Sequence, residues 1–294
     1  MFVVCLWLLV PRAEAATVTV DCDAGSTIGG TLSSLKAGDI LVVSGTCKEN
    51  VTIPAEVVRI TLDGQGKATV QGVRPAAHTI LVMGGQSITI KGCTLTGGRD
   101  GLHLSGPASV VVDGNIIQNN GRGIHLDKGS LGRIINNTIQ NNRGAGINLI
   151  ENSFARIGVL VPPETAANTI QDNGGHGIRV GQMSSARIVG NTIANNQGSG
   201  VAVDRNSQVD VTGNTINGNR GDGIAATHGS GVTLKGEGIL QGDRPNQTDP
   251  ALKNGGVGIR CAIGGYVEGP IGTLIGVQGA KEFDTTCIER LSLP

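Results

Sequence analysis

The sequence predicts an all-β protein, a right-handed parallel β-helix whose coils of about 22–23 residues stack along one axis. Three observations lead to this prediction: a short motif recurs at a nearly constant interval, glycine and asparagine mark the turns, and aromatic residues are scarce. The 294 residues include 48 glycines without a Gly-X-Y period, which excludes collagen. Hydrophobic residues make up 38% of the chain, and a narrow core of stacked Val, Ile and Leu needs few aromatic rings.

The repeat is clearest in the middle of the chain. Asn-Thr-Ile begins at Asn137, Asn168, Asn191 and Asn214, and Asn-Ile-Ile begins at Asn115, so successive spacings are 22, 31, 23 and 23 residues. Each repeat continues through a glycine turn to a second strand of the type Gly-Ile-x-Leu. Both segments alternate apolar and polar residues, which is typical of strands with one buried face.

One asparagine at the same place in every coil predicts a hydrogen-bonded ladder, because an amide side chain both donates and accepts. Of the 21 asparagines, 18 lie between residues 115 and 219. The expected rungs are Asn115, Asn137, Asn168, Asn191 and Asn214.

The two ends of the chain depart from the repeat. Residues 1–16 resemble a signal peptide, with a short apolar run followed by small residues; the alternative is a buried N-terminal strand. We expect residues 17–294 to form a single domain, in which Ser26 or Thr27 caps a short helix over the open edge of the first coil. Residues 241–254 break the period and are expected to form an irregular insertion, and residues 266–294 to cap the other end.

Five cysteines lie after residue 16, and none has metal-ligand spacing. Export to a secreted or periplasmic location would place them in an oxidising compartment. We expect disulfides between Cys22 and Cys47 and between Cys261 and Cys287, one near each end of the solenoid. Cys93 is then left as a buried thiol.

The charges balance. Lys and Arg number 23, as do Asp and Glu, and removal of Arg12 and Glu14 with the leader leaves 22 of each. A neutral protein lacks the basic field that non-specific nucleic-acid binding requires, so no nucleic-acid partner is expected. No later apolar stretch is long enough for a transmembrane segment. The pattern makes no prediction of oligomeric state.

Three stretches resemble a known group of proteins: residues 38–53 (GDILVVSGTCKENVTI), residues 60–66 (ITLDGQG) and the coils of type GNTI…GxGI. They are similar to right-handed β-helix repeat proteins of the pectin-lyase-like superfamily, over nearly all of residues 17–294. This resemblance implies the fold. The superfamily includes polysaccharide lyases, hydrolases and epimerases, periplasmic helper proteins and non-enzymatic adhesive proteins, so the fold does not fix the function.

Stacked coils about 4.8 Å apart place equivalent residues in vertical columns. The x position of Gly-Ile-x-Leu points outward, which predicts that His103, His125, Asn148 and Arg179 share one column. By resemblance, this strand and the loop before it correspond to the face on which superfamily enzymes carry their active sites. The candidate catalytic residues are His103, His125, Asp127, Arg122 and Asp100.

Elimination on a uronic-acid polymer needs a base and a cation that neutralises the neighbouring carboxylate. Two stacked histidines would disfavour each other's charge while Asp127 would favour it, so one neutral and one charged imidazole could result. The alternative is that these are ordinary polar residues on an outer face. The superfamily's grouped aspartates do not appear; no cofactor or metal is expected, and calcium stays open without a clear ligand cluster.

A second outward column lies four residues before the ladder and contains Arg133 and Arg187. It also contains Arg156 on the assumption that the extra residues of the long repeat follow this arginine. Stacked arginines repel one another unless an anion bridges them, which favours a bound polyanion. The alternative is that Asp210, other carboxylates and solvent balance the charge. His78, His176 and His228 are expected to be turn or surface residues. The few exposed aromatics argue against a sugar-stacking cleft.

The sequence therefore favours a secreted β-helix that binds an extended acidic polysaccharide. Whether the protein also processes that polymer by lyase or epimerase chemistry stays open. The alternative is a non-catalytic structural or interaction module of the cell surface or periplasm. The candidate ligand-binding residues are Arg133, Arg156, Arg187, Arg179 and Asn148.

Overall fold

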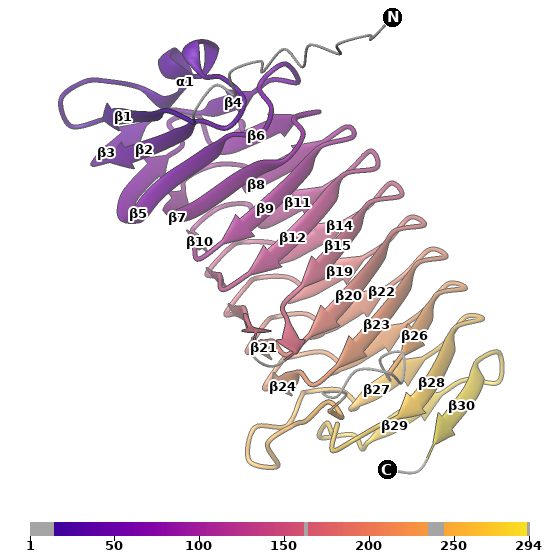
Figure 1. The fold of residues 1–294 in the computed structure, drawn as a ribbon. Helices are drawn as coiled ribbons and strands as arrows, with labels where there is room; N and C mark the ends of the chain where they lie inside the picture. Colours follow the sequence, from indigo (N-terminus) through magenta and orange to yellow (C-terminus); the bar gives the residue numbers. More distant parts are fainter. Residues whose placement is uncertain (1–14, 162–163, 235–243, 293–294) are drawn as a thin grey trace, which may run out of the picture.

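The computed structural model describes residues 15–161, 164–234 and 244–292, so the expected signal peptide at residues 1–16 lies almost entirely outside the described residues. The chain winds into a parallel solenoid of about 11 turns, as Figure 1 shows, and the predicted right-handed β-helix is confirmed. Strands stack on equivalent strands of neighbouring coils, so residues 22 or 23 apart in the sequence become direct neighbours. No helix among the described residues is long and apolar enough to cross a lipid bilayer.

One side of the solenoid is a ten-stranded sheet formed by one strand from each coil. Its members are β4 (Val51–Ile53), β6 (Ile80–Met83), β8 (Asp100–Ser105), β11 (Arg122–Leu126), β14 (Ile147–Leu149), β19 (Ile178–Val180), β22 (Val201–Val203), β25 (Ile224–Ala226), β27 (Ile259–Cys261) and β29 (Lys281–Phe283).

The remaining faces of the solenoid are formed by an 18-stranded sheet, whose strands stand in two rows along the axis. The long strands β5 and β7 continue around the coil and belong to both rows. The first row contains β1 (Thr17–Asp21), β2 (Ile40–Ser44), β5 (Thr61–Gln71), β7 (Ile88–Thr96), β9 (Ser109–Asp113), β12 (Leu131–Ile135), β15 (Phe154–Ile157), β20 (Ser185–Val189), β23 (Gln208–Thr212), β26 (Gly231–Thr233), β28 (Tyr266–Pro270) and β30 (Ile288–Ser292). The second row contains β3 (Thr46–Lys48), β10 (Ile116–Gln118), β13 (Thr138–Gln140), β18 (Thr169–Gln171), β21 (Thr192–Ala194), β24 (Thr215–Asn217) and the ends of β5 and β7.

The core is a set of vertical apolar stacks. Ile139, Ile170, Ile193 and Ile216 occupy one register across four coils, and all are fully buried. Because each coil contributes only short strands, the interior is narrow and is filled by aliphatic side chains. This agrees with the low aromatic content of the sequence.

Two asparagine ladders, not one, run along the solenoid. The predicted ladder continues beyond Asn214 to Asn246, with each side-chain oxygen accepting from the main-chain N–H and the side-chain amide of the asparagine one coil earlier. A second ladder turns the next corner of each coil. Its rungs are Asn120, Asn142, Asn173, Asn196, Asn219 and Asn254. The asparagines after each Asn-Thr-Ile motif, which were expected only to mark turns, therefore build a second structural column.

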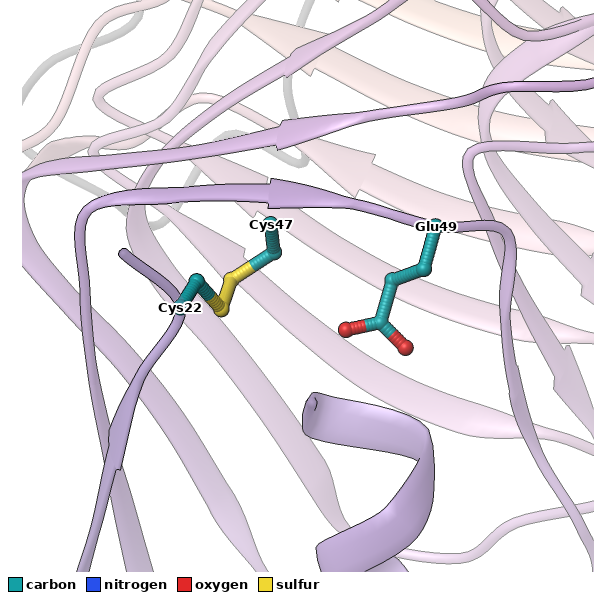
Figure 2. A group of neighbouring side chains, drawn as sticks. All are labelled: Cys22, Cys47 and Glu49. Carbon is teal, nitrogen blue, oxygen red and sulfur yellow. A yellow bond between two sulfur atoms is a disulfide. The ribbon is translucent and has the colours of Figure 1, made fainter. Parts of the chain in front are cut away.

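The N-terminal end is closed by a helical turn and a disulfide. Helix α1 (Ile28–Thr31) and the 3-10 turn η1 (Leu32–Ser34) follow Thr27, whose hydroxyl accepts from Gly30 N–H as a helix N-cap. Glu49 also accepts from the N–H groups of Ile28 and Gly29, at 2.7 and 3.0 Å, and Figure 2 shows its carboxylate directed at the helix. The predicted capping helix is confirmed.

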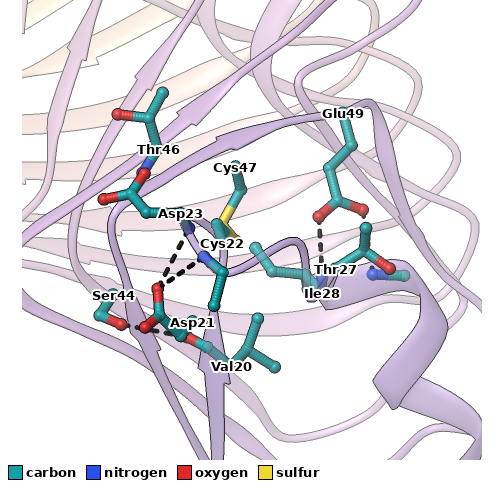
Figure 3. The surroundings of a disulfide bond; sticks show 12 residues. Val20, Asp21, Cys22, Asp23, Thr27, Ile28, Ser44, Thr46, Cys47 and Glu49 are labelled. Carbon is teal, nitrogen blue, oxygen red and sulfur yellow. Dashed lines mark hydrogen bonds between the residues drawn. A yellow bond between two sulfur atoms is a disulfide. The ribbon is translucent and has the colours of Figure 1, made fainter.

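Both predicted disulfides are present. Cys22–Cys47 ties the end of β1 to β3, and its surroundings in Figure 3 include hydrogen bonds between Asp21, Asp23 and nearby main-chain groups. Cys261–Cys287 links the last coils. Cys93 is a buried free thiol, as expected, and burial raises its pKa to about 12.

The long 31-residue repeat and the expected insertion have local structure of their own. In the long repeat, β16 (Leu160–Val161) and β17 (Glu164–Thr165) pair antiparallel beside the solenoid. Of the expected insertion at 241–254, residues 244–254 are described, and Asn246 and Asn254 occupy rungs of the two ladders. Residues 266–292 contain β28, β29 and β30, which continue the parallel pairing.

Replacement of a ladder rung should destabilise the whole solenoid. Asn196→Ala leaves Asn173 N–H and the carbonyl of Ile170 without their buried partners. At about 1–3 kcal/mol for each unsatisfied buried group, we expect a loss of about 2–4 kcal/mol in the free energy of unfolding, measured by denaturant titration. Gln197→Ala is the control, because this amide is exposed and adjacent in the chain. Equal stability of the two variants would contradict the structural role of the ladder.

Candidate functional site

The outer face of the ten-stranded sheet carries the predicted histidine column. His103 on β8 pairs with His125 on β11, which pairs with Asn148 on β14 and then with Arg179 on β19. The four side chains expected to share a column therefore do so.

These histidines point away from the core, yet they are almost completely covered. His103 is 8% exposed and His125 is 3% exposed. Their rings stack edge to face with centroids 4.6 Å apart, and His78 contacts the other side of His103 with centroids 4.2 Å apart. The neighbouring side chains exclude most solvent from both rings, so these outward-pointing histidines are not exposed.

Asp127 joins the two histidines. Its Oδ2 atom lies 3.0 Å from His103 Nε2 and 3.6 Å from His125 Nε2. Asp127 is 8% exposed, and its Oδ1 atom is buried without a hydrogen-bond partner. Burial alone would raise the pKa of this carboxyl. The interactions of the carboxylate with Ser105 and the two histidines have the larger effect, so the pKa is lowered. Asp127 is therefore a buried carboxylate held ionised by Ser105 and the two histidines.

Asp100 is the second acidic residue of this face and is fully buried. Arg122 binds both of its oxygens, with Nε–Oδ1 at 2.6 Å and a second bond of 3.0 Å to Oδ2. Oδ2 also lies 2.9 Å from His78 Nδ1 and 3.2 Å from His103 Nδ1. Burial would raise the pKa of Asp100, but the hydrogen bonds from His103, His78 and Arg122 hold it well below its usual range. Both of its oxygens are thus already engaged.

His78 belongs to this cluster, although it was expected to be only a turn or surface residue. It precedes Leu81 by three positions, as Asp100 precedes His103, and Leu81 and His103 are paired in register. Extending the register one coil toward the N-terminus places His78 level with Asp100, but the register alone does not show that the two side chains meet. The sequence repeat is weaker there, because no Asn-Thr-Ile motif marks that coil.

The column continues as a series of compensated charges. Arg179 binds Asp204 through two bonds of 2.8 and 2.9 Å and reaches Asn148 Oδ1 at 3.3 Å. Arg260 binds Asp222 through two bonds of 2.7 and 3.2 Å further along the same sheet. The guanidinium charges on this face are neutralised within the protein.

The arginine column lies on a different face, formed by β12, β15 and β20. Arg133, Arg156 and Arg187 pair in register, which confirms the assumed placement of Arg156 in the long repeat. Beside them an open groove of about 380 Å³ is lined in part by Leu131 and Phe154. These two side chains are 49% and 38% exposed.

Leu131 and Phe154 were missed as surface features. Each stands two residues before an arginine on the same strand, Leu131 before Arg133 and Phe154 before Arg156, so both point outward. Leu131 and Phe154 occupy equivalent positions of successive coils and pair in register. Two apolar residues at the same outward position were the signal that could have identified them.

Three groups of side chains in the described parts of the chain bring metal-ligating atoms within 4.8 Å of one another. One contains Cys22, Cys47 and Glu49, but its two sulfur atoms form a disulfide (Figure 2). The other two share His103: one adds His78 and Asp100, and the other adds His125 and Asp127. The group with His125 offers two imidazole nitrogens and one carboxylate, which are donor types that zinc and copper ions accept.

Residues 48–220 match the protein family described as "Periplasmic copper-binding protein (NosD)". The chain belongs to the NosD family. A periplasmic location for this NosD-family protein agrees with its two disulfides. No curated protein matches the chain.

Solved structures similar to this NosD-family chain are parallel β-helices. The alginate lyase from Paenibacillus sp. str. FPU-7 has a TM-score of 0.58 at 18% identity, covering 93% of this chain and 99% of that one. Pectate lyase Pel9A has a TM-score of 0.59 at 13% identity, covering 94% and 82%. The A-module of the Azotobacter vinelandii mannuronan C-5 epimerase AlgE6 has a TM-score of 0.53 at 14% identity, covering 96% and 92%. At these identities the likeness shows the shared fold.

His125 should make stability depend on pH. Burial first, then the charges of Arg122 and His103, lower its pKa from 6.5 to about 4. Between these values the unfolded chain binds the proton and the folded chain does not, so stability falls on acidification. We expect a loss of about 2 kcal/mol between pH 7 and pH 5 from this group.

Denaturant unfolding at the two pH values measures this loss. His125→Asn should reduce the pH dependence, and asparagine already occupies the next position of the column at Asn148. His228→Asn is the control, because His228 is exposed and asparagine tolerates its positive φ of 53°. An unchanged pH dependence in His125→Asn would contradict the lowered pKa.

Proposed function

We propose that this protein binds an extended acidic polysaccharide along the face formed by β12, β15 and β20. The observation that carries the proposal is the in-register stack of Arg133, Arg156 and Arg187, of which the first two line the groove. Neighbouring positions are one coil apart, about 4.8 Å, so three guanidinium groups stand in a row along the axis. A polymer with regularly spaced carboxylates would match this spacing.

The groove adds the second requirement for sugar binding. Phe154 and Leu131 provide partly exposed apolar surface on which the face of a sugar ring could pack, directly beside the guanidinium groups of Arg156 and Arg133. Apolar walls with a few convergent polar groups are the usual composition of a ligand site. This arrangement supports recognition of a ring that carries a carboxylate.

The structural neighbours support the same substrate class. They are an alginate lyase, a pectate lyase and a mannuronan C-5 epimerase, and alginate, pectate and mannuronan are acidic polysaccharides. We therefore propose an acidic polysaccharide as the ligand of this chain.

Processing of the polymer by lyase or epimerase chemistry at His103, His125, Asp127, Arg122 and Asp100 has less support than binding. Arg122, the one arginine among the candidate catalytic residues, is already bound by both oxygens of Asp100. His125 has the neutral form that a base requires, but a pKa of about 4 makes it a weak proton acceptor at neutral pH. We therefore favour the non-catalytic binding module.

Substitution of the central arginine should weaken binding. We expect Arg156→Ala to bind polygalacturonate or alginate at least tenfold more weakly by isothermal titration calorimetry, and Arg156→Lys to lie between it and the wild type, because lysine keeps the charge but loses the planar fork. Binding should weaken with added salt. Arg220→Ala, at an exposed turn, should bind as the wild type does. Equal binding of neutral dextran, or no effect of Arg156→Ala, would contradict the proposal.

Incubation with the same polymers tests the choice between binding and processing. We expect neither the ultraviolet absorbance of an unsaturated product nor new reducing ends above a protein-free blank. If product accumulates and His125→Ala abolishes it, the protein is a lyase and the binding module is the wrong choice. Epimerisation is checked on the recovered polymer by proton NMR.

A further inference from the structure

We infer that Lys281 and Glu289 form a charged closure of the apolar core, which prevents a second copy of this chain from stacking on this end of the solenoid. The two residues lie on β29 and β30, in the coil farthest from α1 (Figure 1). Within the described parts of the chain, β29 pairs only with β27 and β30 pairs only with β28. The inference does not depend on polysaccharide binding.

Lys281 stands where the preceding coils place an aliphatic residue of the core. Val201, Ile224 and Ile259 pair in register along the ten-stranded sheet, and Lys281 pairs with Ile259 as the next member of this column. The three aliphatic side chains are fully buried. Because residues in register on neighbouring parallel strands point to the same face of a sheet, the side chain of Lys281 starts toward the core.

Glu289 occupies the equivalent place in a second core column. Val209, Val232 and Val267 pair in register along the 18-stranded sheet, and Glu289 pairs with Val267. The three valines are buried. Two separate columns of the core therefore both change from aliphatic residues to a charged residue in the same coil, and the two charges are opposite.

The two charged side chains meet across the end of the core. Lys281 Nζ forms an ion pair with Glu289 Oε1, although the two residues belong to different sheets. Lys281 Nζ also lies 5.4 Å from the ring centroid of Phe283, a partly buried residue that packs against the core. Both contacts agree with the core-facing direction that the register gives to Lys281 and Glu289.

This ion pair affects association more than it affects the stability of the coil. The side chains of Lys281 and Glu289 are 48% and 40% exposed, and ion pairs so open to water add little to stability. A second molecule stacked on this coil would remove both charges from water, at a desolvation cost that their mutual attraction does not fully offset. Inward-pointing charges are one way in which β-proteins protect open strand edges.

The surroundings of the ion pair show why such protection is needed. Ile288 is 55% exposed, and Leu291 and Phe283 are only partly buried against the core. Apolar side chains beside strand edges favour pairing with another chain. The opposite end of the solenoid is covered by α1 (Figure 1), so the surface that this end would otherwise accept is the same end of a second copy, related by a two-fold axis.

Replacement of both charges by the residues one coil earlier tests the inference. Lys281→Ile/Glu289→Val repeats Ile259 and Val267 in their columns. We expect the wild type to be a monomer by size-exclusion chromatography with light scattering, and the double variant to have at least twice its mass. Small-angle X-ray scattering should give the variant a maximum dimension nearly twice that of the wild type, because the molecules join end to end. Lys281→Met/Glu289→Gln removes the charges with less change in shape and should also associate, which decides the test if the first variant does not fold.

Two double variants serve as controls. Lys281→Glu/Glu289→Lys reverses the ion pair, keeps both charges at the end of the core and should stay monomeric. Lys91→Ile/Asp63→Val makes an apolar replacement of an ion pair on the side of the solenoid and should also stay monomeric. Circular dichroism and thermal unfolding verify that each variant is folded. A folded charge-free variant that stays monomeric, a wild type that already associates end to end, or equal association of Lys91→Ile/Asp63→Val would overturn the proposal.

Discussion

Hydrogen bonds between asparagine side chains of successive coils hold the register on which the rest of this protein depends. Each rung, such as Asn191, accepts from one neighbouring coil and donates to the other, so a shift of a single coil would break bonds on both sides. The two ladders stand at corners of the coil, where main-chain groups turn away from the sheets. They satisfy buried main-chain groups that the parallel strands do not reach.

Because the register is fixed, the spacing of residues in the sequence decides which side chains are neighbours on the surface. Once coils are locked in place, each outward position becomes one step in a column, and two columns of this protein have opposite character. On the ten-stranded sheet, Arg122 and Arg179 are each bound by a carboxylate. On the face of β12, β15 and β20, Arg133 and Arg156 stack directly above one another. The first face binds its arginines with carboxylates of the same sheet, and the second places two of its arginines along an apolar groove.

Burial of the histidine cluster needs its own explanation. Polar groups that leave water cost free energy unless they find partners. Asp100 is fully engaged by Arg122, His78 and His103, whereas Asp127 keeps one oxygen without a partner. The cluster is therefore more completely hydrogen-bonded around Asp100 than around Asp127.

The sequence by itself determined the coil, the first ladder, both disulfides and the members of each column, because period and strand alternation decide which residues are vertical neighbours. Only the tertiary structure decided which columns touch one another. The burial of His125, the entry of His78 into the cluster and the groove beside Phe154 depend on side-chain direction and on the path of the turns. These are contacts between side chains of different columns or turns. The repeat period of a sequence specifies which residues stack within a column, but not the distance between one column and the next.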